Sequence, residues 1–221
     1  MQISYKIAQE INKVRTNPKD YCHQLSNFKM NFDHLILNLP DFNVGIKTSE
    51  GKKAYDDAID FLEKQNEIHP LNPIQSLFKI SEDYLTEIQK IDYSEINNID
   101  IESIIKKYGD FCGNFCRIVK FGYSDPEVIV NNLLACDGDS NRNERKIVMN
   151  ENFYDFGVAF GKHNFFGYCT VIVFCSEFKS KESNNDENVD IGYEEQWFYI
   201  FNDYNKILFK NNILILKFQN S

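Results

Sequence analysis

A short polar segment, CDGDSNRNER from Cys136 to Arg145, gathers the residue types with the greatest chemical potential in this chain. A thiol beside guanidinium groups can be held as a reactive thiolate, and carboxylates can move protons or bind cations. The same residues also suit a structural loop, in which Cys136 is a buried, inert thiol and Asp137 bonds Arg142. We favour the structural interpretation, because the sequence has no His–Cys dyad, serine nucleophile elbow, phosphate-binding loop or dinucleotide fingerprint.

The histidines and the other cysteines do not form a metal-binding pattern. Cys112 and Cys116 are separated by three residues, which is not zinc-knuckle spacing, and no second pair accompanies them. Among the four histidines, His163 is the pocket candidate, although a turn histidine bonded to the backbone explains it equally well. We therefore expect no catalytic residue, no metal and no cofactor.

The elements that position these residues change character along the chain. Apolar residues at helical spacing, with capping residues before them, predict helices up to about residue 135. The expected helix starts are Asn17-Pro18, Thr48-Ser49-Glu50, Asn72-Pro73 and Asp125-Pro126, with a short helix ending near Tyr108-Gly109. Residues 154–161 and 167–178, rich in Phe, Val and Ile, predict an antiparallel hairpin. We divide the chain into a domain at 1–178, a polar loop at 179–192 and a β-rich extension at 193–221.

Composition limits the partners and the compartment. A chain of 221 residues that is 43% hydrophobic can bury a core without staples, and its net charge of −9 argues against nucleic acid as a partner. The N-terminus reaches Lys6 and Glu10 without an apolar run, which predicts no secretory signal, and no stretch is long enough to cross a membrane. We expect the six cysteines to be thiols in an intracellular, cytoplasmic or cytoskeletal or ciliary setting.

Six motifs follow one another along the chain: Glu10–Pro18, Glu50–Ala54, His69–Leu71, Leu133–Lys146, Gly157–His163 and Tyr168–Phe174. Together they resemble motifs of the CAP superfamily of cysteine-rich secretory proteins, antigen 5 and pathogenesis-related proteins. The resemblance, to a divergent protist or microbial branch, implies an α+β fold: a three-layer α-β-α sandwich with a central antiparallel sheet. It also implies a cleft that in family members is lined by two His and two acidic residues, which bind a divalent cation in some of them.

This chain departs from the family at that cleft. The family's His of Arg-Gly-His-Arg aligns with Glu144, its Glu of Gly-Glu-Asn aligns with Arg117, and residues 92–106 contain no His for the other. A guanidinium has no lone pair to donate to a metal. We predict an Arg117–Glu144 charge pair that fills the cleft. The vestigial cleft positions are then Arg117, Asp137, Arg142, Glu144 and His163.

These features predict a non-catalytic structural or interaction subunit of a larger intracellular assembly with protein partners. The extension is unusually apolar, and strands of this kind cover a sheet or dock on a partner. Its candidate partner contacts are Trp197, Tyr199, Phe201, Phe209, Ile213 and Ile215. Two alternatives stay open: a lipid- or sterol-binding CAP domain with an apolar groove, and a divergent cation-dependent hydrolase-like protein built on Glu144, His163 and acidic residues that the resemblance does not align.

Overall fold

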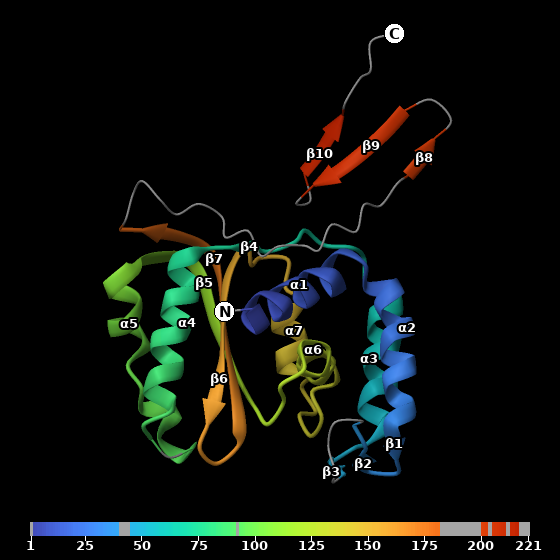
Figure 1. The fold of residues 1–221 in the computed structure, drawn as a ribbon, viewed down its shortest axis with the longest axis horizontal. Helices are drawn as coiled ribbons and strands as arrows, with labels where there is room; N and C mark the ends of the chain where they lie inside the picture. Colours follow the sequence, from blue (N-terminus) through green and yellow to red (C-terminus); the bar gives the residue numbers. More distant parts are fainter. Residues whose placement is uncertain are drawn as a thin grey trace. The chain divides into compact units, whose positions relative to one another are not determined.

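A computed structural model describes residues 2–39, 45–91, 93–181, 200–202, 205–210 and 213–216 of the chain (Figure 1). The chain divides into two compact units, Met1–Val189 and Asp190–Ser221. Each unit is described here by itself. In the part of the chain that the structure describes, no helix combines the length and the apolar character that a membrane crossing requires.

The larger unit alternates helices with short and long strands. Its helices are α1 (Gln2–Thr16), α2 (Pro18–Phe28), α3 (Lys52–Lys64), α4 (Gln75–Ile88), α5 (Ile101–Tyr108), α6 (Pro126–Ala135) and α7 (Asn143–Val148), with 3-10 turns η1 (Lys29–Asn31) and η2 (Tyr93–Asn98). Its strands are β1 (Phe32–Asp33), β2 (Ile36–Leu37), β3 (Ile46–Lys47), β4 (Asn72–Pro73), β5 (Gly109–Phe121), β6 (Asp155–His163) and β7 (Gly167–Ser180).

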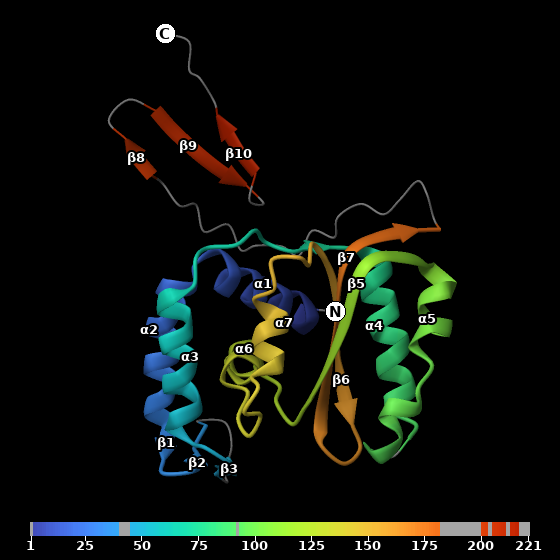
Figure 2. The ribbon, with the colours of Figure 1, turned by 180° about the vertical axis from the view of Figure 1, so that it is seen from behind.

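A four-stranded sheet of order β4-β6-β7-β5 forms the centre of this unit. β5 and β6 each pair with β7 in antiparallel fashion, so that Val158 and Ile118 both lie opposite Ile172. Helices α4 and α5 lie on one side of the sheet, and α1, α6 and α7 lie on the other (Figures 1 and 2). Consecutive residues of β6 and β7 are therefore buried, because both of their faces are covered.

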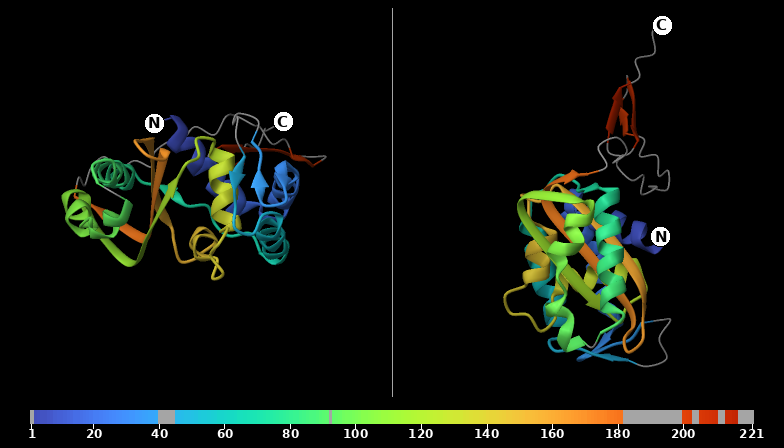
Figure 3. Two further views of the ribbon diagram at one scale, coloured as in Figure 1. Left: turned by 90° about the horizontal axis from the view of Figure 1, so that it is seen from below. Right: turned by 90° about the vertical axis from the view of Figure 1, so that its left-hand side faces the viewer.

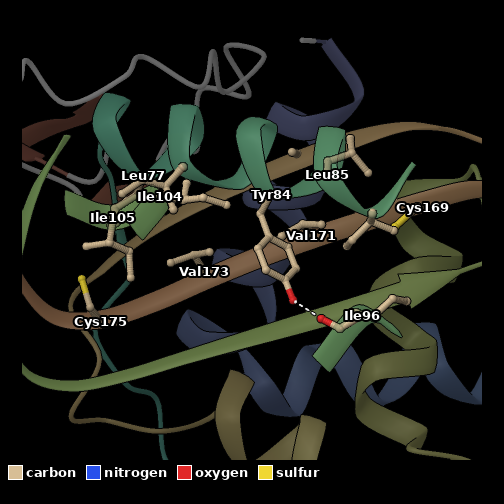
Figure 4. Packing of buried hydrophobic residues seen from close by; sticks show 13 residues of the cluster. Leu77, Tyr84, Leu85, Ile96, Ile104, Ile105, Cys169, Val171, Val173 and Cys175 are labelled. Carbon is tan, nitrogen blue, oxygen red and sulfur yellow. Dashed lines mark hydrogen bonds between the residues drawn. The ribbon is translucent and has the colours of Figure 1, made fainter. Parts of the chain in front are cut away.

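The core on the α4 side of the sheet is mainly aliphatic, and it includes the buried ring of Tyr84. Leu77, Tyr84 and Leu85 of α4 pack against Val171 and Val173 of β7 (Figure 4). The Tyr84 hydroxyl donates a hydrogen bond to the Ile96 carbonyl at 3.1 Å. Helix α4 approaches the sheet closely at Gly157 of β6, since a Cβ at this position would lie 2.1 Å from the Leu77 carbonyl carbon.

Most of the predicted elements of the larger unit are present. α2 begins at Pro18, the hairpin of β6 and β7 turns after His163, and the Asp125 carboxylate accepts a hydrogen bond from the Val128 N–H at 3.0 Å as the cap of α6. The chain has mixed helical and strand structure, with both antiparallel and mixed sheets. The expectation of a wholly antiparallel central sheet is wrong at β4, which pairs with β6 in parallel.

Two further expectations are wrong at particular segments, and one strand was not expected. Asn72-Pro73 is strand β4 and not a helix start; α4 begins at Gln75. Strand β5 has no counterpart among the predicted elements, because a bulge between Cys112 and Phe115 and partial exposure on both faces remove its alternating pattern. The polar loop expected from residue 179 begins inside β7, which continues to Ser180.

Arg15 of α1 ties several irregular segments to the helical layer. Its side chain is fully buried and donates to the carbonyls of His69 (3.1 Å), Val148 (2.7 Å), Asn150 (3.0 Å) and Phe153 (3.3 Å). Burial lowers the pKa of Arg15 to about 10, so the guanidinium stays charged at neutral pH. Arg15 thus supplies several of the hydrogen bonds that hold the end of α7 and the connection that follows it.

Asn12 lies one turn before Arg15 and fixes the approach to β4. Its amide donates to the Leu71 carbonyl at 2.9 Å, and its carbonyl oxygen accepts from the Leu71 N–H at 2.8 Å. A side-chain amide that pairs with both backbone groups of one residue imitates a strand partner. Asn12 and Arg15, both in the opening motif Glu10–Pro18, therefore have structural roles.

The smaller unit contains an antiparallel sheet of order β10-β9-β8. Its strands are β8 (Ile200–Asn202), β9 (Asn205–Lys210) and β10 (Ile213–Leu216). Among the candidate partner contacts, Phe201, Phe209, Ile213 and Ile215 lie in these strands, while Trp197 and Tyr199 lie outside the described residues. Phe209 is opposite Leu214 in the β9–β10 register.

Replacement of Arg15 by Met is expected to lower the free energy of unfolding by about 3 kcal/mol, because four backbone carbonyls, at two buried and two partly buried hydrogen bonds, lose this donor. Arg15→Lys should fall between Met and wild type, since an ammonium cannot reach all four acceptors. Urea unfolding followed by circular dichroism measures the loss. Lys19→Met, at an exposed position of α2, is the control; equal stability of Arg15→Met and wild type would contradict the role given to Arg15.

Candidate functional site

The polar segment that begins at Cys136 forms a tight loop between α6 and α7. Cys136 and Arg142 both have left-handed backbone conformations, with φ of 50° and 52°, which are uncommon for residues other than glycine. Between them, the Asp139 carboxylate accepts from the N–H groups of Asn141 (2.8 Å) and Asn143 (2.9 Å). The hydrogen bonds from Asn143 and Asn141 lower the pKa of Asp139, so the loop contains its own fixed anion.

Arg142 connects this loop to the beginning of α3. Its guanidinium holds the Glu50 carboxylate in a bidentate pair at 2.6 and 2.8 Å and donates to Asp57 at 2.9 Å. The hydrogen bonds from Arg142 lower the pKa of Glu50 to about 2, and the same contacts raise the pKa of Arg142. Glu50 is therefore ionised and fully engaged at neutral pH.

The Asp137 carboxylate binds backbone N–H groups of the segment that precedes α3. Its two carboxylate oxygens accept from the N–H groups of Ser49 and Glu50, each at 2.7 Å. The predicted Asp137–Arg142 bond is therefore wrong. Both residues fix the loop, but each does so through the segment before α3, whose N–H groups have no helical acceptor of their own.

Arg145 places a second buried cation beside Asp57. Its side chain is 3% exposed, donates to the Asp57 carboxylate at 3.0 Å, and lies 5.4 Å from the centre of the Phe61 ring. Burial opposes the charged form of Asp57, but the guanidinium groups of Arg142 and Arg145 outweigh it and lower the pKa of that carboxyl. The Asp57 carboxylate thus bridges two arginines and accepts hydrogen bonds from both.

The cleft position Glu144 pairs with a different cation from the one predicted. Lys120 of β5 donates to Glu144 at 2.6 Å, and the Cys136 thiol lies 3.8 Å from the same oxygen. Arg117 instead lies 4.9 Å from the centre of the Tyr84 ring, on the α4 side of the sheet. The predicted Arg117–Glu144 pair is wrong, and no ion pair joins these two described residues.

The physical reason is the alternation of side chains along β5. Arg117 is opposite Val173, a member of the core beneath α4, whereas Lys120 is opposite Thr170. Residues three apart on a strand point to opposite faces. The cation that reaches the α6–α7 side is therefore Lys120, and sequence comparison alone had placed the wrong basic residue at the cleft.

Cys136 and His163 both have structural environments. Burial raises the pKa of the Cys136 thiol, which is 2% exposed, in agreement with the inert cysteine that we predicted. The His163 Nδ1 accepts from the N–H groups of Phe165 (3.2 Å) and Phe166 (3.4 Å), so its proton resides on Nε2. His163 is thus a turn histidine bonded to the backbone, with its ring against Phe121 at 5.1 Å.

Two other kinds of site concern metal ions and small molecules. Within the described ranges, no three His, Cys, Asp or Glu side chains gather closely enough to hold a metal ion. A pocket of about 450 Å³ lies between residues 17–20 at the start of α2 and residues 65–67 after α3, and its lining is polar. The residues that sequence reasoning missed are Asp57 and Lys120, whose importance depends on partners distant in sequence.

Comparison with known proteins gives little further information. No family model and no curated protein matches the chain. Among solved structures, a cysteine-rich secretory protein from Staphylococcus aureus subsp. aureus Mu50 is similar, with 13% identity and a TM-score of 0.36. The similarity covers 57% of this chain and 38% of that protein.

Replacement of Glu50 by Gln is expected to lower stability at pH 7 by about 1 kcal/mol, with allowance for solvent screening of this partly exposed pair. Because the folded-state pKa of Glu50 is about 2, its contribution is complete above pH 5 and is lost as the pH falls toward 2. Unfolding midpoints between pH 7 and pH 2.5 should therefore fall less steeply for Glu50→Gln than for wild type. Glu82→Gln, an exposed acid of α4, should keep the wild-type slope; parallel curves for wild type and Glu50→Gln would rule out this contribution.

Proposed function

We propose that this chain is a CAP-like α-β-α sandwich whose cleft serves structure, and that it acts as a non-catalytic interaction subunit of a larger intracellular assembly. A cytoskeletal or ciliary lattice is one such assembly. The partner is a protein, and the C-terminal unit is the part of the chain that meets it.

The observation that carries this proposal is the engagement of the ionisable groups around the α6–α7 loop. A general base or metal ligand needs an unoccupied lone pair that faces the substrate. Glu144 is paired with Lys120, and Glu50 and Asp57 are held by Arg142 at 2.6–2.9 Å. His163 lies at a different turn and uses Nδ1 for the backbone. These contacts support a scaffold more than a catalytic centre.

The cysteines support the intracellular setting. All six lie in the described residues and none forms a disulfide. Burial raises the pKa of Cys169 to about 12 and raises that of Cys175 further. Cysteines without disulfides are typical of proteins in reducing compartments.

The size of the C-terminal unit supports a docking role. A unit this small buries little apolar surface with which to offset the entropy of ordering its chain. Strands β8, β9 and β10 contain Phe201, Phe209, Ile213 and Ile215, and form a unit separate from the larger one. Such a sheet is stabilised by contact with another surface, and a protein partner supplies one. The polar lining of the pocket beside α2 does not suit an apolar lipid.

Cross-linking of the full chain in native cells, with the linked peptides identified by mass spectrometry, tests this role. We expect links from residues 200–216 to one partner, and a loss of at least tenfold in its recovery for the double variant Phe209→Ser/Ile215→Ser. Lys206→Ala, in the same strand β9, should retain the partner.

A cleft variant separates this role from chemistry. Lys120→Met/Glu144→Gln removes the cleft ion pair and should leave partner recovery unchanged. Partner loss in the cleft variant, or hydrolytic activity of the wild type that this variant abolishes, would contradict the proposal.

A further inference from the structure

Large apolar side chains are exposed at one end of the larger unit. Of the seven exposed large apolar side chains among the described residues, five belong to two short segments: Met30, Leu35, Ile36, Phe165 and Phe166. The first three lie in η1 and in the hairpin of β1 and β2, and the other two lie in the turn between β6 and β7. The two segments lie at the same end of the unit, apart from each other across its width (Figures 1 and 3). Apolar side chains gathered in this way indicate a contact surface.

The turn between β6 and β7 presents a fixed apolar tip. Its strands pair as far as His163, whose Nδ1 accepts hydrogen bonds from the N–H groups of Phe165 and Phe166. The Phe166 ring lies 4.8 Å from the Phe121 ring, between ring centres, and is 42% exposed. Phe165 is 76% exposed. The hydrogen bonds that hold the turn therefore keep the Phe165 ring in water.

The segment around β1 and β2 divides its apolar residues between the interior and the solvent. Phe28 and Phe32 are buried, with their ring centres 5.4 and 5.0 Å from that of Tyr55 in α3. Met30 is 74% exposed and Leu35 is 43% exposed. The packing on α3 thus uses the two phenylalanines and leaves Met30 and Leu35 on the outside.

Charged side chains of both signs border the two apolar segments. Lys47 of β3 is opposite Ile36 in the strand register and is exposed, and Lys162 is exposed beside the β6–β7 turn. Asp33 of β1 adds a carboxylate whose side chain is 80% exposed. Lysine side chains lay their methylene stems along an apolar surface and keep the ammonium in a polar layer. These lysines can therefore bind phosphate oxygens while the neighbouring apolar side chains are buried.

We propose that this end of the larger unit contacts the surface of a membrane of zwitterionic phospholipid. A bilayer interface is a continuous plane, so both apolar segments can enter it at once, whereas a protein partner needs two hollows at a matching separation. Lys47 and Lys162 bind lipid phosphate groups, and Asp33 faces the cationic part of the headgroup. The net charge of −9 favours lipids without net charge over anionic lipids.

This contact is independent of the protein partner proposed for the C-terminal unit. It lies in the membrane interface, about 5–10 Å deep, and requires no helix that crosses the bilayer. Its residues belong to the larger unit alone, so that variants at this end leave strands β8, β9 and β10 unchanged.

Co-sedimentation of the full chain with sucrose-loaded phosphatidylcholine vesicles tests the proposal. We expect the bound fraction of the wild type to rise with lipid concentration, and the double variant Met30→Ser/Phe165→Ser to lower the partition coefficient about tenfold, because two exposed apolar side chains are lost from the interface. Phe111→Ser is the matched control: Phe111 is exposed but lies opposite Phe178, at the end of β7 away from the turn, and its variant should bind as the wild type does.

Two further measurements complete the test. Addition of phosphatidylserine to the vesicles should weaken binding, because the protein carries a net negative charge. The unfolding midpoint of Met30→Ser/Phe165→Ser should equal that of the wild type, because both side chains are exposed.

Four outcomes would overturn the proposal. The first is a wild type that does not sediment with phosphatidylcholine vesicles. The second is equal binding of the wild type and Met30→Ser/Phe165→Ser, which would place the lipid contact elsewhere in the chain. The third is binding to anionic vesicles alone. The fourth is a double variant that loses self-association in analytical ultracentrifugation and keeps its vesicle binding, which would make this end a contact between copies of the chain.

Discussion

The larger unit depends on one buried guanidinium. Arg15 donates to four backbone carbonyls: Val148 ends α7, Asn150 and Phe153 lie in the connection between α7 and β6, and His69 precedes β4. A carbonyl removed from water needs a donor, and a planar fork of N–H groups can serve several at once. Together with the Asn12–Leu71 pairing, this contact sets where β4 and β6 begin.

A second constraint acts at the α6–α7 loop, where the charged residues stabilise one another. Asp57 lies between two arginines, Glu50 is held by both oxygens, and Asp137 caps the approach to α3. Charges in a partly buried environment are stable only when they are paired and hydrogen-bonded. A segment that resembles a reactive site in sequence is therefore used to fasten α3 to the loop, and the thiol of Cys136 is enclosed by it.

The register of β5 determines which basic residue pairs with Glu144. Arg117 and Lys120 lie three residues apart on one strand, yet one packs over Tyr84 and the other pairs with Glu144. A bulge between Cys112 and Phe115 shifts the pairing of β5 with β7. Each residue added at a bulge exchanges the two faces of the strand that follows. The type of contact at the cleft, an ion pair with Glu144, was foreseen, whereas its cation was not.

The sequence by itself determined the local elements: the helix that begins at Pro18, the cap at Asp125, the hairpin that turns after His163, and the burial of Cys136. These depend on spacing and capping within a few residues, which a sequence displays directly. Tertiary structure alone decided the partners of Arg15, Arg142 and Lys120, because each lies far away along the chain; Arg142 and Glu50, for example, are separated by 92 positions. It also decided strand β5, whose half-exposed residues take their conformation from pairing with β7 and not from any pattern of their own.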